Sequence, residues 1–203
     1  MVISLDNLTS GTNKKSKIIS KYNSSSAFYD NRYRKIQERK YQIILNNYDL
    51  NEKFILDLGC GTGLLFTYFI NLKNEQKDNF YFYVAIDISW KMLLEFKSKL
   101  NKFKAKNKLS LVLSDIENLP FRANIFYSVF SLTSFQNLPN INKGVKESIR
   151  VSRDNANFKF SILKKKLNLE MLLDFLKPLT EVEKIVKRED LEDIINLGKI
   201  LKD

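Results

Sequence analysis

A short glycine-rich segment constrains the fold of this chain more than any other feature. The apolar run Phe54–Leu58 contains one acid, Asp57, and leads into glycines at alternate positions, which are Gly59, Gly61 and Gly63. Glycine lets the backbone turn tightly and lets a ligand approach the main chain where a Cβ would collide. A helical pattern follows at Leu64–Ile70, and the first turn of a helix offers unpaired N–H groups. This order predicts a nucleotide-type cofactor site at the carboxyl edge of a parallel sheet.

The spacing of the glycines narrows the kind of cofactor. Dinucleotide sites carry Gly-x-Gly-x-x-Gly, and phosphate-binding loops end in Gly-Lys-Ser/Thr, whereas this loop has neither pattern. It contains no lysine that could meet a phosphate. The carboxylate of Asp57 would repel a pyrophosphate and attract an ammonium group. A ligand with a cationic amino-acid end and an adenosine end therefore suits the loop better than NAD.

With Cys60 and Thr62 included, the segment resembles the first motif of class I S-adenosylmethionine-dependent methyltransferases. Three later segments resemble the next motifs of that family in order, namely Tyr81–Ser89, Leu111–Phe121 and Ile125–Leu138. The resemblance covers the chain from Phe28 onward. It implies an α/β fold with a Rossmann-like, seven-stranded, mostly parallel sheet, helices on both faces and a C-terminal antiparallel hairpin. It departs from the family at Tyr127, where an acid is common.

The resemblance also implies a role for particular residues. In the family the first motif holds the methionine end of the cofactor, the second the ribose, the third the adenine, and the fourth lies beside the methyl group. The matching cofactor-binding residues are Asp57, Gly59, Cys60, Gly61, Gly63, Asp87, Ile88, Asp115, Ile116, Ser131 and Leu132, with Thr133 also beside the methyl group. Tyr29, before the first strand, would help to cover the cofactor, or would serve only in packing. The resemblance names no catalytic residue.

Each of these features has an ordinary structural alternative. A lone glycine loop can be a plain strand-to-helix turn, Asp87 or Ser89 can be a helix N-cap, and Asp115 can be a turn residue. Their joint occurrence at the spacing of alternating strands and helices favours a cofactor site. A domain of this kind that binds the cofactor, or nothing, and acts only as a scaffold or RNA-binding subunit remains the rival class.

The rest of the chain predicts a flexible basic tail at 1–24 and a methyltransferase domain at 25–203. The tail is polar and rich in lysine and serine, and tyrosine and isoleucine then recur at helical spacing between about 28 and 48. Strands are expected near 53–58, 81–87, 109–114, 125–132 and 157–163, and helices near 62–72, 90–105, 142–152 and 167–177. Two short strands at 182–186 and 193–200 would form the hairpin, with one helix over 182–201 as the alternative.

Charge bears on the methyl acceptor. The 203 residues carry a net charge of +11, and a basic surface raises affinity for nucleic acid, although lysine runs are commonly solvated faces. We expect tRNA or rRNA as the acceptor, with a protein side chain or a small molecule as alternatives. The segment Ser131–Gln136 lacks the Asn-Pro-Pro-Tyr pattern of glutamine, adenine and cytosine methylators, which argues against that chemistry. Gln136, Asn137 and Tyr29 are candidate acceptor-side groups.

A partner protein and the cellular setting can also be inferred. The apolar strand 109–113 would lie at the sheet edge, and an exposed edge invites another strand. The resemblance implies such a partner, because relatives in archaea and eukaryotes often bind a small zinc-containing activator protein along that edge; a helix or the tail covering the strand is the alternative. The sequence has no histidine and one cysteine, so we expect no metal site. It has no apolar run of about 18 residues and no secretory signal pattern, so we expect no membrane contact and a cytoplasmic protein.

Overall fold

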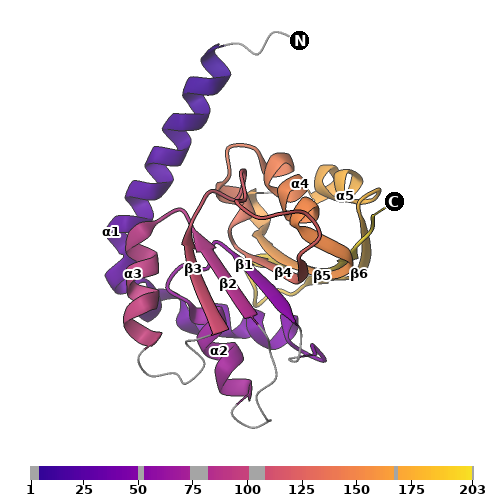
Figure 1. The fold of residues 1–203 in the computed structure, drawn as a ribbon, viewed down its shortest axis with the longest axis horizontal. Helices are drawn as coiled ribbons and strands as arrows, with labels where there is room; N and C mark the ends of the chain where they lie inside the picture. The colour runs from indigo at the N-terminus through magenta and orange to yellow at the C-terminus, as the bar shows by residue number, and fades with distance from the viewer. Residues whose placement is uncertain (1–4, 50–52, 74–81, 101–107, 167–168, 203) are drawn as a thin grey trace.

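A seven-stranded sheet organises the computed structural model, which describes residues 5–49, 53–73, 82–100, 108–166 and 169–202 (Figure 1). The strands lie side by side in the order β3-β2-β1-β4-β5-β7-β6. Strands β1 to β5 run parallel, and β7 is antiparallel to both β5 and β6. Their bounds are β1 Phe54–Leu58, β2 Phe82–Asp87, β3 Leu109–Leu113, β4 Phe126–Leu132, β5 Ser152–Leu163, β6 Thr180–Lys187 and β7 Asp193–Ile200. The expected fold class is confirmed, and the alternative of one helix over 182–201 is wrong.

Helices cover both faces of this sheet (Figure 1). Three of them share one hydrophobic core with one face, namely α1 (Leu5–Ile44), α2 (Leu64–Lys73) and α3 (Trp90–Lys99). Two others share a second core with the opposite face, namely α4 (Ile141–Val151) and α5 (Leu169–Leu176). Short 3-10 turns, η3 (Phe135–Asn137) and η4 (Lys164–Lys166), follow β4 and β5. None of the helices in the described ranges is both long and apolar enough to cross a membrane.

The alternation of side chains along the strands produces the two cores. In β1, Ile55 faces the core of α1, α2 and α3, whereas Leu56 and Leu58 face the other core. In β2, Tyr83 faces the core of α1, α2 and α3, and Val84 faces the other core. Successive side chains of a strand point to opposite faces, so apolar strands of this kind must be covered on both sides. The carboxyl ends of β1 to β4 are thereby fixed at one edge, where the candidate site lies.

The N-terminal segment differs from its expected structure. The sequence predicts a flexible tail up to residue 24, but α1 begins at Leu5 and continues without a break to Ile44, and its first turns project beyond the sheet (Figure 1). Ile18, Tyr22 and Tyr29 lie at helical spacing and border one cavity. The hydroxyls of Ser24 and Ser25 bond back to the Lys21 oxygen, one turn earlier in the helix. Such bonds satisfy the hydroxyls but slightly destabilise a helix, so the contacts of α1 with the rest of the chain keep this stretch helical.

Strand β5 begins five residues earlier than expected, at Ser152. Its first part contains exposed polar residues and Asn155 with φ of 57°, and the pairing with β4 is irregular between Phe126 and Ser128. A bulge places polar side chains outside the usual alternation, which hid the strand in the sequence. Portions of the expected strand at 81 and helices at 101–105 and 167–168 lie outside the described residues.

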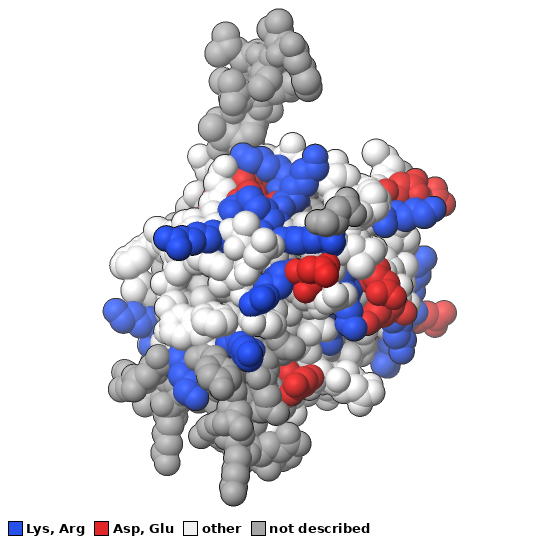
Figure 2. Space-filling view, turned by 45° about the vertical axis from the view of Figure 1, so that its right-hand side comes forward, with Lys and Arg blue, Asp and Glu red and all other residues white. Residues whose placement is uncertain are grey.

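Positive charge is spread over the surface. Figure 2 shows more Lys and Arg than Asp and Glu on the face drawn, with a group of cationic side chains below the N-terminal projection. This agrees with the net charge of +11.

Candidate functional site

The glycine loop between β1 and α2 depends on the absence of side chains. Gly59 and Gly63 have φ of 72° and 78°, which side-chain-bearing residues rarely adopt. A Cβ on Gly59 would lie 2.4 Å from Ser134 Oγ, and a Cβ on Gly63 would lie 2.3 Å from the Phe96 ring. The N–H groups of Gly59 and the next residue both donate to the Ile86 oxygen. The loop is therefore clamped between β2, α3 and the turn after β4.

Asp57 is a buried acid at the end of β1. Its side chain is 2% exposed and accepts a hydrogen bond of 2.9 Å from the Tyr83 hydroxyl. Burial raises the pKa of Asp57 to about 7, and the nearby Asp87 carboxylate adds to this, although the Tyr83 bond opposes it. The carboxyl borders a small cavity of about 30 Å³ together with Tyr29 and Leu132. A cationic group placed there would restore the ionised form.

Asp87 ends β2 and holds the glycine loop from the other side. Its Oδ2 accepts from the Gly61 N–H and its Oδ1 from the Ser89 N–H, both at 2.8 Å. Burial raises the pKa of Asp87, and these backbone bonds oppose the shift. The N-cap of α3 is Ser89, whose hydroxyl accepts from the Met92 N–H at 3.3 Å. Asp87 thus keeps free lone pairs on both oxygens for ligand hydroxyls.

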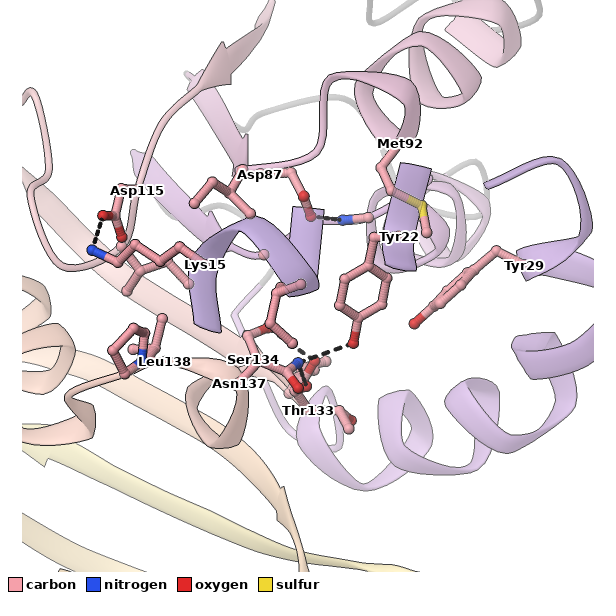
Figure 3. Close-up of a pocket in the computed structure, with 17 residues that line it drawn as sticks. Lys15, Tyr22, Tyr29, Asp87, Met92, Asp115, Thr133, Ser134, Asn137 and Leu138 are labelled. Carbon is pink, nitrogen blue, oxygen red and sulfur yellow. Dashed lines mark hydrogen bonds and ion pairs between the residues drawn. The ribbon is translucent and has the colours of Figure 1, made fainter. Parts of the chain in front are cut away.

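Asp115 follows β3 and faces a lysine from α1. The Lys15 Nζ lies 2.5 Å from Asp115 Oδ2 (Figure 3) and 2.5 Å from Glu117 Oε2. Asp115 also accepts the Glu117 N–H at 2.9 Å, which is the turn role considered for it. A second contact of α1 joins the Tyr22 hydroxyl to the Asn137 amide at 2.9 Å. The N-terminal part of α1 therefore contacts the segments that follow β3 and β4.

Asp87, Asp115 and Lys15 line a cavity of about 80 Å³, called here the cofactor cavity. Ligand sites commonly measure about 300–1,000 Å³. The cavity is small because Lys15, Ile18 and Tyr22 of α1 line it, so a ligand as long as S-adenosylmethionine needs these side chains to move. The polar groups fit such a ligand, since Asp87 and Asp115 line the cavity at separate places (Figure 3), and Ile88 and Ile116 add apolar side chains to the same lining.

The structure brings most of the sequence-predicted residues together. Those that border the cofactor cavity or the Asp57 cavity are Tyr29, Asp57, Gly59, Cys60, Gly61, Asp87, Ile88, Asp115, Ile116 and Leu132. Gly63 instead packs against Phe96, and Ser131 is fully buried in β4 and borders neither cavity. Lining residues that the sequence reasoning missed include Lys15, Ile18, Tyr22, Met92, Ser134 and Leu138. The helical spacing of Ile18, Tyr22 and Tyr29 was the signal that could have indicated the residues of α1 among them.

A second and larger hollow, of about 990 Å³, lies beside the first and is called here the lateral cleft. It shares Tyr22, Tyr29, Thr133 and Asn137 with the cofactor cavity. Its remaining lining comes chiefly from α1 and from the ends of β5 and β7, and includes Lys14, Lys21, Phe28, Arg32, Tyr33, Gln37, Lys40, Gln136, Lys165, Glu192 and Asp193. Gln136, Asn137 and Tyr29, the candidate acceptor-side groups, all border this cleft.

Thr133 forms part of the wall between the two hollows. Its φ is 59°, which is an outlier for a β-branched residue. The strain is held by a bond from its N–H to the Ser161 oxygen at 2.9 Å and from its hydroxyl to Asp193 Oδ2 at 2.9 Å. Lys40 Nζ lies 3.1 Å from the same carboxylate oxygen, and burial lowers the pKa of Lys40 although Asp193 opposes this. Strained residues of this kind cluster at functional sites.

Comparison with known proteins identifies the family. A methyltransferase-domain model matches residues 56–160, which begin in β1 and end in β5. The chain belongs to the methyltransferase-domain family. Over 148 residues, or 72% of this chain and 53% of the relative, it is 30% identical to the ubiquinone/menaquinone biosynthesis C-methyltransferase UbiE of Wigglesworthia glossinidia brevipalpis. The chain spans about half the length of the curated relatives it matches.

Solved structures of this methyltransferase fold superpose on most of the chain. Magnesium protoporphyrin IX methyltransferase of Synechocystis, determined with bound S-adenosylmethionine, gives a TM-score of 0.72 at 15% identity and covers 93% of this chain and 97% of its own. A methyltransferase solved in complex with the Trm112 activator of Haloferax volcanii gives a TM-score of 0.67 at 13% identity. The match covers 89% of this chain and 98% of that chain. At these identities the match shows the fold alone.

Proposed function

We propose that the protein is an S-adenosylmethionine-dependent methyltransferase whose catalytic unit is residues 25–203. The observation that carries the proposal is Asp57, a carboxyl 2% exposed beside the glycine loop, whose pKa is raised to about 7 by burial. An ammonium group next to it would offset the unfavourable burial of the charge. The acids that end β2 and follow β3 border the adjoining cavity. Family membership and the fold support the same cofactor.

In this proposal the residues of the chain bind and orient the two reactants. Asp57 binds the ammonium of the cofactor, Asp87 its ribose hydroxyls, and Asp115 the adenine amino group. Leu132 and Tyr29 line both the cofactor cavity and the Asp57 cavity, and so would shield the methyl group from water. The bound cofactor supplies a methyl group on a positively charged sulfur, which is already activated for transfer. The chain then needs mainly to align the acceptor with that methyl group.

Calorimetry tests the cofactor site directly. We expect the full chain to bind S-adenosylmethionine, and likewise its demethylated product, with a stoichiometry of one ligand per chain. No detectable heat with ligand in large excess would overturn the proposal. The rival scaffold role is tested by incubating the protein with methyl-labelled cofactor and cell extract, because a scaffold binds cofactor without labelling any acceptor.

We further propose RNA, either tRNA or rRNA, as the methyl acceptor. The lateral cleft opens next to Thr133 and is lined by five Lys or Arg side chains and two carboxylates, and cationic surfaces attract the phosphate backbone. A small molecule is the second candidate, since the name of the UbiE relative describes a C-methyltransferase of quinone biosynthesis. Incubation with labelled cofactor and fractionated cell RNA, protein and metabolites decides between them. Label in the metabolite fraction alone would overturn the RNA assignment.

A partner at the edge of the sheet is proposed as well. Strand β3 is the first in the strand order, so one of its sides pairs with no strand of the described chain, and Leu113 is 60% exposed. We propose that a small zinc-containing activator of the archaeal type pairs along β3; the Haloferax volcanii complex supports this by its fold. Co-purification with such an activator should be lost in Leu113→Asp and kept in Leu94→Asp, which alters an exposed leucine on α3. A monomeric protein that is fully active alone would exclude an obligate activator.

A further inference from the structure

We propose that the lateral cleft binds an unpaired nucleobase of an RNA strand and recognises its ring N–H group through the side-chain oxygens of Gln37 and Gln136. The inference rests on the proposed methyltransferase function and specifies how the acceptor is held. Three independent properties of the cleft support it: two unpaired amide oxygens, a row of aromatic rings and a cationic rim.

The amide oxygens of the cleft are the most specific of these properties. Gln37 Oε1 and Gln136 Oε1 are both buried and have no hydrogen-bond partner among the described residues. The Gln136 Nε2 donates to the Thr133 oxygen at 2.8 Å, so its amide orientation is fixed and its oxygen can only accept. A buried acceptor without a partner costs about 1–3 kcal/mol. A ligand N–H group that reaches these oxygens would remove that cost.

The aromatic rings of α1 provide a stacking surface in the same cleft. The rings of Tyr29 and Tyr33 lie 4.7 Å apart between centroids, and Tyr22 lies 6.4 Å from Tyr29. Phe28 also lines the cleft and is 72% exposed, although burying such a ring would be favourable. The guanidinium of Arg32 lies 5.3 Å from the Tyr33 ring centroid. Stacking of a base on an aromatic side chain contributes about 1–3 kcal/mol, and single-stranded RNA is commonly bound in this way.

The rim of the cleft is suited to phosphates. Lys40 and Asp193 neutralise each other in a buried ion pair of 3.1 Å. The other charged residues of the lining are Lys14, Lys21, Arg32, Lys165 and Glu192, or four cations and one acid. Three of these cations, Lys14, Lys21 and Arg32, are on α1. Backbone phosphates of a strand could contact this rim while one base enters the cleft.

The position of the cleft suits methyl transfer. Thr133, Tyr29 and Asn137 border both the cleft and the cofactor cavity, so a base next to Gln136 would lie close to the place proposed for the methyl group. The volume of about 990 Å³ is at the upper end of the range for ligand sites, about 300–1,000 Å³. There is room for a nucleotide with part of its strand.

The test compares two RNA probes on the full-length protein in the presence of the demethylated cofactor product. One is a single-stranded oligonucleotide of uridine and guanosine; the other has the same sequence with 3-methyluridine and 1-methylguanosine, which lack the ring N–H. Fluorescence anisotropy should show at least about tenfold weaker binding of the N-methylated probe. Equal affinity of the wild-type protein for both probes would overturn the inference without need of any variant.

Variants then locate the recognition. Gln136→Leu and Gln37→Leu should each reduce the difference between the two probes. Lys21→Gln and Arg32→Gln should weaken binding of both probes alike. Each should also reduce the slope of the logarithm of affinity against the logarithm of salt concentration by about one unit. Lys187→Gln, an exposed change on β6 outside the cleft, is the matched control and should have no such effect.

Calorimetry with S-adenosylmethionine on the same samples separates the two proposals. Normal cofactor binding with equal affinity for the two probes overturns only the base-recognition inference. Absence of cofactor binding overturns the proposed function on which it rests.

Discussion

The cofactor cavity and the lateral cleft are neighbours built in different ways. The cofactor cavity measures about 80 Å³, and its key groups come from the loops that follow β1 to β4. The lateral cleft measures about 990 Å³ and takes most of its lining from the single helix α1. In the first, backbone turns and buried acids fix the geometry, whereas in the second, exposed cations and rings on one helix set the chemistry. The two sites therefore differ in how much a single substitution can change them.

The sharpest test of this contrast is Asp57→Ala. Removing one partner of a buried charge pair costs about 2–5 kcal/mol, so affinity for S-adenosylmethionine should fall about 30-fold or more by calorimetry. RNA binding should change little, since Asp57 does not line the lateral cleft. Asp190→Ala, at an exposed acid on the turn before β7, is the control. Equal loss of RNA affinity in Asp57→Ala would show that the two sites are not separable.

A second expected effect is a pH dependence of cofactor binding that arises from Asp57 and not from the lateral cleft. Burial raises the pKa of Asp57 to about 7, so the group is mostly neutral at pH 6 and mostly ionised at pH 8. A cationic ligand binds the ionised form, so cofactor affinity should fall about tenfold from pH 8 to pH 6. Binding at pH 6 should release a proton, measurable by calorimetry in buffers of different ionisation enthalpy. The chain has no histidine to titrate in this range, and a flat profile would contradict the role of Asp57.

A smaller change of opposite sign is expected for Lys15→Ala. The Lys15 ammonium lies 2.5 Å from Asp115 and competes there with the adenine amino group. Partly exposed ion pairs contribute about 0–1 kcal/mol, so cofactor affinity should rise up to about fivefold. Lys17→Ala, on the same helix, is the control because Lys17 is exposed and lines neither hollow. Weaker cofactor binding in Lys15→Ala would mean that the lysine supports the ligand.

The smallest effect is expected for Ser131→Ala. Ser131 was a candidate by resemblance, but it is fully buried within β4 and borders neither hollow. Its hydroxyl has no hydrogen-bond partner among the described residues. Cofactor affinity should stay within about twofold of the wild type, and thermal stability should not fall. A large loss of affinity would show that β4 contributes to the cavity more directly than the structure indicates.

The same contrast explains what the sequence could predict. The order of strands and the glycine loop were predictable, because glycine at positive φ and acids at strand ends are backbone requirements that leave a local pattern. Asp57 was proposed from its place beside the glycines, whereas Asp87 and Asp115 were proposed from the family resemblance of their segments; Asp87 and Asp115 border the same cavity. Lys15 and Tyr22 were missed, because a polar, serine-rich segment reads as a tail when its helical contacts are made with distant parts of the chain.

The lateral cleft was harder to predict for a further reason. Lys40 lies 153 positions from Asp193 in the sequence, and no local pattern pairs them. The strained φ of Thr133 likewise depends on Ser161 and Asp193, which belong to other strands. Such groups become visible only when the sheet order places β4, β5 and β7 beside α1.

The continuity of α1 has a consequence for how the two reactants affect each other's binding. One helix, Leu5–Ile44, supplies Lys15 to one hollow, Gln37 to the other and Tyr29 to both. A ligand that displaces Lys15 and Tyr22 also reshapes the surface that the other reactant meets. By thermodynamic reciprocity each reactant must then alter the affinity of the other by one common factor. We expect bound cofactor to change the RNA affinity, and bound RNA to change the cofactor affinity, by the same factor when both are measured by calorimetry.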